Sequence, residues 1–149
     1  MSGERGVIER EIFIAAAPET VFGFLVDPVL MAKWFGITHT VEAYPGGVFR
    51  VEVSRTNVAR GSYTEVIPHR RVAFTWDWES DDPSLTALLP GSSLVEIDLE
   101  PRNGGTLVRL RHSGLPYSLE RIHGERWSHH LARLEEVVLE SVAKRKANL

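Results

Sequence analysis

The segment SLERIHGERWSHHLARLEEVVLESVAK, residues 118–144, carries apolar side chains at helical spacing. Most of its charged side chains, including Arg133, Glu136 and Glu140, fall on the opposite side. A helix of this length would extend ~40 Å at 1.5 Å per residue, enough to cross a whole domain. We therefore expect one long amphipathic helix that covers the rest of the chain with the stripe Leu119, Ile122, Trp127, Leu131, Leu134, Val137, Val138 and Val142.

The chain before this helix is dominated by period-two alternation, which is typical of half-buried strands. Ile8 to Ile14 alternates apolar and charged residues, and the same pattern returns after Trp34 and continues to His112. Turn signals divide this second region into five or six strands, at residues 45–47, 59–60, 68–69, 81–91 and 103–105. Strands joined by hairpins form an antiparallel sheet, of which a helix can cover one face.

Two short helices are expected between the first strand and the rest of the sheet. Pro18 suits the first turn of a helix, and Asp27 can cap a second one over Pro28–Trp34. The longest irregular stretch, residues 81–92, contains three leucines. Apolar residues in a long loop need a partner, so we expect this segment to fold over one end of the sheet as a lid.

Composition limits the classes of protein to consider. A chain of 149 residues with 43% apolar and 25% charged residues is typical of one globular domain, residues 1–149. No apolar run approaches the ~18 residues of a membrane span, and the first ten residues lack a signal-peptide core, so we expect a cytoplasmic protein without a membrane partner. The net charge of −3 gives no reason to expect nucleic acid, and the lack of cysteine excludes thiolate chemistry.

The aromatic residues of one strand suggest where a ligand could bind. Trp76 and Trp78 share strand parity with Phe74, so these side chains project from one face. They could simply fill a core against the long helix, or they could line a cavity if the sheet curves away. His112 ends another apolar row, and it could be a hydrogen-bonded structural residue or a group that orients a ligand.

The histidines of the expected long helix do not favour a metal site. His123 and His130 share a helix face but lie two turns apart, ~10 Å, which is too far for bonds near 2 Å to one ion. The Gly-Gly pairs occupy hairpin turns and precede no helix, unlike a nucleotide-binding loop. We therefore expect neither a metal nor a cofactor.

A set of short phrases in fixed order resembles the family named for the activator of heat-shock protein ninety ATPase, within the START-like helix-grip superfamily. The resemblance spans about Val7 to about Val142, and the phrases are APETVF (17–22), DP (27–28), WF (34–35), PGG (45–47), GSYTEVIP (61–68), VAFTW (72–76), HSGL (112–115) and Trp127. It implies an α+β helix-grip fold, in which a curved antiparallel sheet of six or seven strands wraps around the long C-terminal helix.

The resemblance also implies a cavity between sheet and helix that takes a small hydrophobic, partly aromatic ligand. The expected lining residues are Trp34, Phe35, Tyr63, Trp76, Trp78, His112, Trp127, His130 and Leu134. An alternative is a cyclase- or hydrolase-like enzyme that uses His112 as acid or base, although the residues favour binding over catalysis. A further alternative is a chaperone-interacting protein, but the eukaryotic namesakes carry an additional upstream domain. A second copy of the chain is a candidate partner.

Overall fold

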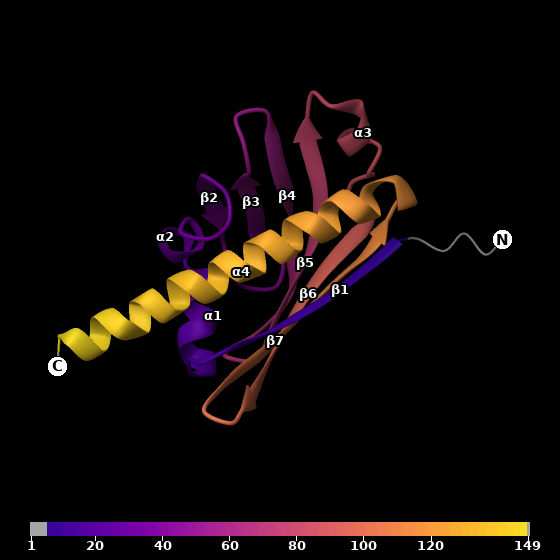
Figure 1. Ribbon diagram of the computed structural model, residues 1–149. Coiled ribbons are helices and arrows are strands. Elements are labelled where there is room, and N and C mark those ends of the chain that lie inside the picture. Colours follow the sequence, from indigo (N-terminus) through magenta and orange to yellow (C-terminus); the bar gives the residue numbers. More distant parts are fainter. Residues whose placement is uncertain (1–5, 149) are drawn as a thin grey trace.

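The computed structural model describes residues 6–148, which form a seven-stranded sheet and four helices. Helix α4 runs diagonally across one face of the sheet (Figure 1). The elements in chain order are β1 (Gly6–Ile14), α1 (Pro18–Val26), α2 (Pro28–Met31), β2 (Thr38–Val41), β3 (Val48–Glu52), β4 (Asn57–Ile67), β5 (Arg71–Ser80), α3 (Pro83–Thr86), β6 (Ser93–Arg102), β7 (Gly105–Leu115) and α4 (Tyr117–Ala147).

All neighbouring strands are antiparallel, in the order β1-β7-β6-β5-β4-β3-β2. Strands β2 to β7 form consecutive hairpins, whereas β1 is placed beside the last strand, with Gly6 opposite Leu115 and Ile14 opposite Thr106. The curved sheet around a long C-terminal helix confirms the predicted α+β helix-grip fold.

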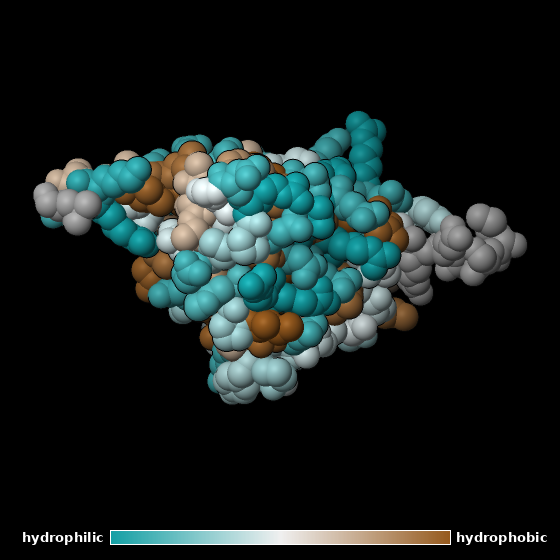
Figure 2. Space-filling view, turned by 90° about the horizontal axis from the view of Figure 1, so that it is seen from below, coloured by the Kyte–Doolittle hydropathy of each residue, from teal (hydrophilic) through white to brown (hydrophobic). Residues whose placement is uncertain are grey.

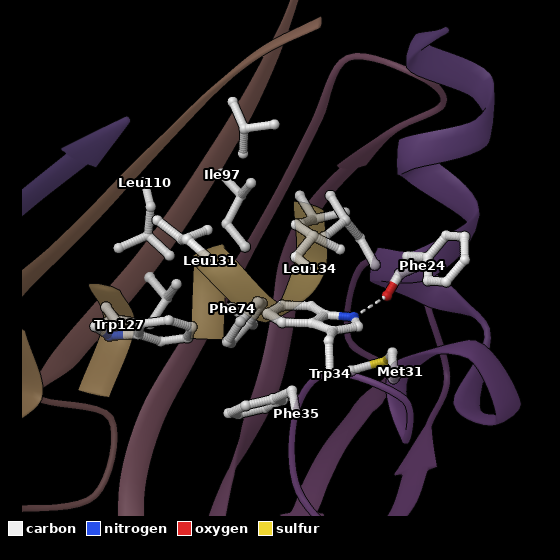
Figure 3. Packing of buried hydrophobic residues seen from close by; sticks show 14 of the residues in the cluster. Phe24, Met31, Trp34, Phe35, Phe74, Ile97, Leu110, Trp127, Leu131 and Leu134 are labelled. Carbon is white, nitrogen blue, oxygen red and sulfur yellow. Dashed lines mark hydrogen bonds between the residues drawn. The ribbon is translucent and has the colours of Figure 1, made fainter. Parts of the chain in front are cut away.

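Helix α4 buries the predicted apolar stripe. Trp127, Leu131 and Leu134 are at most 3% exposed and pack against strand residues such as Phe74, Ile97 and Leu110 (Figure 3). The helix continues to Ala147, three residues beyond the predicted end, where three consecutive basic residues interact favourably with the helix dipole. One stripe position differs, since the side chain of Ile122 is 47% exposed.

The predicted second helix is shorter than expected because its last residues turn inward. Asp27 caps α2 as predicted, accepting a hydrogen bond of 2.8 Å from the Val29 N–H. The helix ends at Met31, and the Trp34 indole N–H then donates to the Phe24 carbonyl at 2.8 Å. Figure 3 shows this bond tying the segment after α2 to α1.

The predicted turn at residues 59–60 is wrong, because both residues belong to β4 and the turn lies at residues 54–56. Arg60 pairs across the sheet with Asp77, and their side chains are joined at 2.8 Å. Since Asp77 is only 5% exposed, its carboxylate requires such a partner. Arg60 is therefore half of an ion pair between β4 and β5 and not part of a turn.

Ionic groups also join the strands on the sheet face away from α4. The Arg71 guanidinium contacts Glu65 and Glu96 at 2.6 Å and Asp98 at 2.9 Å, which raises the pKa of Arg71 above its ordinary value.

The molecular face in Figure 2 is mostly hydrophilic, with hydrophobic residues in separate patches. Within residues 6–148, no helix combines the length and apolar character needed to cross a membrane.

Candidate ligand-binding cavity

A cavity of about 410 Å³ lies beside the N-terminal half of α4. Its walls come from four parts of the fold: the segment after α2, the β3–β4 turn, the end of β5 with the α3 segment, and α4 itself. The lining residues are Phe35, Val53, Ser54, Asn57, Trp76, Trp78, Asp82, Ser84, Leu85, Ser118, Leu119, Ile122, His123, Arg126, Trp127 and His130.

Three buried aromatic rings form the floor of this cavity. Phe35 stacks on Trp127 with ring centroids 5.7 Å apart and planes 20° from parallel. Trp76 lies 5.9 Å from Phe35 and 5.4 Å from Trp127, so each ring touches the other two. All three are at most 3% exposed. The sequence brings them together because β5, the α2 segment and α4 each direct one aromatic side chain to the same place.

His112 lies behind the floor and is not among the lining residues. It is fully buried, and its Nδ1 accepts a hydrogen bond of 3.1 Å from the Trp127 indole N–H. The ring proton must then be on Nε2, which donates to Ser93 Oγ at 3.1 Å, and the Ser93 hydroxyl donates to the Trp76 carbonyl. Burial, and secondarily the electrostatic effect of His123, lower the pKa of His112 to about 3. The imidazole is therefore neutral with a fixed tautomer.

A second tryptophan–histidine pair lies at the cavity wall. The Trp78 indole N–H donates to Nε2 of His123 at 3.0 Å, and Nδ1–H of His123 donates to the Leu119 carbonyl at 2.9 Å. Burial is the main cause that lowers the pKa of His123. His123 and His112 are thus both neutral, but they carry their protons on opposite nitrogens.

His130 closes the far end of the floor, where its ring meets Phe35 edge-on at 5.0 Å. Burial lowers the pKa of His130 to about 4, assisted by the nearby charges of His129 and Arg126 and opposed by a hydrogen bond with the Trp34 backbone. This side chain is neutral near pH 7.

Five of the nine predicted ligand-binding residues line the cavity, and four lie elsewhere. Besides His112, these are Trp34, Tyr63 and Leu134, which belong to the core. Tyr63 is 1% exposed, contacts Phe49 and Phe74, and has no hydrogen-bond partner for its hydroxyl among the described residues. Burial raises the pKa of Tyr63.

The sequence did not single out the mouth of the cavity. The expected lid, residues 81–92, contributes Asp82, Ser84 and Leu85 to the wall, and it inserts Leu88 into the core at 2% exposure. Ile122 and Arg126 lie opposite on the exposed side of α4. The apolar pattern assigned Ile122 to the buried stripe, because a stripe alone does not reveal where the partner sheet ends.

Within the described part of the chain, no group of three His, Cys, Asp or Glu residues is placed to hold a metal ion. The indole N–H of Trp76 is buried without a hydrogen-bond partner among residues 6–148. The site therefore offers aromatic stacking surfaces, and the ring nitrogens of His112 and His123 already have protein partners.

A family model described as Activator of Hsp90 ATPase homolog 1-like protein matches residues 15–139. The chain belongs to this family. The match covers the first helix, all strands after β1 and most of α4, so it confirms the resemblance found in the sequence. A comparison with curated proteins gave no match.

Solved structures with the same fold agree with this assignment. The solution structure of an AHSA1-like protein from Rhizobium etli is 44% identical, with a TM-score of 0.69 over 89% of this chain and 81% of that one. DynU16, from the dynemicin biosynthetic locus, has a TM-score of 0.74 at 21% identity, over 88% of this chain and 46% of that one. The Aha1 dimer from Colwellia psychrerythraea has a TM-score of 0.71 at 20% identity, over 89% and 95%. The last two show the fold alone.

Proposed function

We propose that this family member binds a small, flat hydrophobic ligand between the α3 segment and α4. The observation that carries the proposal is the aromatic floor of Phe35, Trp76 and Trp127 beneath a cavity of about 410 Å³. That volume lies within the ~300–1,000 Å³ of ordinary ligand pockets. Aromatic rings with offset or edge contacts favour a ligand that is itself aromatic or conjugated.

The protonation states support binding rather than catalysis. An acid or base must reach the substrate with an exchangeable proton or a free lone pair. In His112 and His123 both ring nitrogens already have protein partners, and burial keeps the rings neutral. A ligand could reach neither imidazole without breaking a buried hydrogen bond, which costs about 1–3 kcal/mol for each group left unpaired.

Apolar contact with the three rings would supply the affinity. Apolar burial at ~25 cal/mol per Å² over a few hundred Å² gives several kcal/mol after association costs.

The proposal is tested with the neutral fluorophore N-phenyl-1-naphthylamine, which brightens when it enters an apolar site. We expect saturable binding that Ile122→Trp weakens about tenfold, since the larger side chain would fill the mouth. Leu139→Trp is the matched control, because Leu139 is exposed on the same helix and lines no part of the cavity. Native mass spectrometry of freshly purified protein would identify a copurifying molecule.

Absence of saturable binding by this probe and by a panel of neutral aromatic compounds would refute the proposal. Equal weakening by both tryptophan variants would place the binding outside the cavity. Chemical conversion of a bound compound at a rate lost in His112→Ala would favour an enzyme instead.

Partner and compartment are proposals of the same kind. We propose the cytoplasm, since a chain without cysteine suits a reducing compartment. A second copy is a candidate partner because the Colwellia relative is a dimer. Light scattering over a range of protein concentrations would decide between monomer and dimer.

A further inference from the structure

Arg126 stands out among the residues at the mouth of the cavity. It is exposed on α4, directly before the floor residue Trp127 and one turn before His130. Eight arginines in residues 6–148 form ion pairs with carboxylates. Arg126 forms none there, and it is the arginine that lines the cavity. Its guanidinium is therefore available to a ligand.

The other titratable groups of the cavity lining are two neutral histidines and one carboxylate that is already hydrogen-bonded. His123 and His130 are neutral, and the charge of Arg126 is among the causes that lower the pKa of each. Asp82 is the one carboxylate in the lining, and it caps α3 by accepting bonds from the Ser84 N–H at 2.9 Å and the Ser84 hydroxyl at 2.7 Å. These bonds lower the pKa of Asp82, so it stays ionised, and both are accepted by Oδ1, which they hold toward α3.

Arg126 thus combines with the aromatic floor to select for charge as well as shape. A guanidinium binds carboxylates and similar oxyanions through two parallel hydrogen bonds, and it stacks on flat conjugated groups. We propose that the ligand is an amphipathic organic anion, with a flat aromatic body on Phe35, Trp76 and Trp127 and a carboxylate or equivalent oxyanion paired with Arg126 at the mouth. This inference rests on the proposed function, since it names the ligand class of the same cavity.

The test compares two fluorophores that differ by one charged group. 1-Anilinonaphthalene-8-sulfonate is N-phenyl-1-naphthylamine with an added sulfonate. The affinity of the neutral compound therefore measures binding in the cavity, and the difference between the two affinities measures the effect of the charge. We expect Arg126→Gln to weaken binding of the anionic probe about tenfold and binding of the neutral probe less than twofold. Arg126→Lys should retain part of the preference, because it keeps the charge but loses the fork of donors.

Arg121→Gln is the matched control. Arg121 lies on the same helix, is exposed, pairs with Glu125 and lines no part of the cavity, so it changes the net charge equally. Unchanged binding of the anionic probe in Arg126→Gln, or equal losses in Arg126→Gln and Arg121→Gln, would overturn the inference and leave the proposed function intact. Failure of the neutral probe in the wild-type protein would refute the proposed function itself.

Discussion

Lowering the pH from 7.5 to 5.0 should destabilise the fold through His112. Burial lowers the pKa of His112 to about 3 in the folded chain, against 6.5 for the exposed group. Below about pH 6.5 His112 of the unfolded chain binds a proton, whereas His112 of the folded chain stays unprotonated down to about pH 3. The stability present above pH 6.5 is therefore lost as the pH falls.

The magnitude follows from this difference in proton binding. At pH 5.0 the unfolded chain is favoured by about 1.4 kcal/mol for each of the 1.5 pH units below 6.5, so His112 alone costs about 2 kcal/mol. His130 acts in the same direction, since burial lowers its pKa to about 4, but its partial exposure makes its contribution smaller. Carboxylates contribute little in this window because they are ionised in both states above about pH 5.

Urea denaturation at half-unit pH steps, followed by tryptophan fluorescence, measures the effect. Long-range proton–nitrogen NMR spectra supply the direct check: His112 should keep the Nε2–H tautomer down to pH 5. His129→Gln is the control for the removal of a histidine, since His129 is exposed on the same helix. A flat stability profile from pH 7.5 to 5.0, or an imidazolium signal from His112 within that range, would refute the reasoning.

Trp127→Ala should lower the free energy of unfolding by ~3–5 kcal/mol, as measured by urea denaturation, because it truncates a floor ring that is 2% exposed. Trp127→Phe should cost about 1–3 kcal/mol, since it leaves Nδ1 of His112 without a donor, and a loss under 0.5 kcal/mol would contradict that bond's role. Gly114→Ala should lower the melting temperature by several degrees more than Gly104→Ala. Both glycines have φ near +80°, so a side chain strains the backbone at either position. Of the two, only Gly114 would place a Cβ against a carbonyl oxygen, that of Ser92, at 2.2 Å. Equal losses in the two variants would therefore point to backbone strain alone.

The fold could be predicted because both of its periodicities are strong. In the strands and in α4 the buried positions carry apolar residues, and these recur with the period of each element, so the pattern can be read from the sequence. The turn near residue 59 was misplaced because the partner that holds Arg60 within the sheet, Asp77, lies 17 positions away. Long-range ion pairs of this kind leave no local signal.

The site was predicted in part because parity gives the direction of a side chain and not its position along the sheet. The side chains of Tyr63 and Trp76 both point toward α4. Tyr63 lies opposite Phe74 in the packed core, whereas Trp76 lies opposite Ser93, nearer the cavity. His123 could have been found as a polar residue within a buried stripe. Its bond with Trp78 depends on where α4 crosses β5, which sequence spacing does not specify.

The pairing of β1 with β7 has a consequence for how the chain folds. Strands β2 to β7 pair with their neighbours in the chain, through hairpins or, between β5 and β6, through the α3 segment. Gly6 instead pairs with Leu115, so the entropy of closing a very long loop opposes this contact. Sheets dominated by such distant pairings fold in milliseconds to seconds, far more slowly than helical bundles. During synthesis β1 emerges before every other strand of the sheet, and it waits without a partner until β7 has been made.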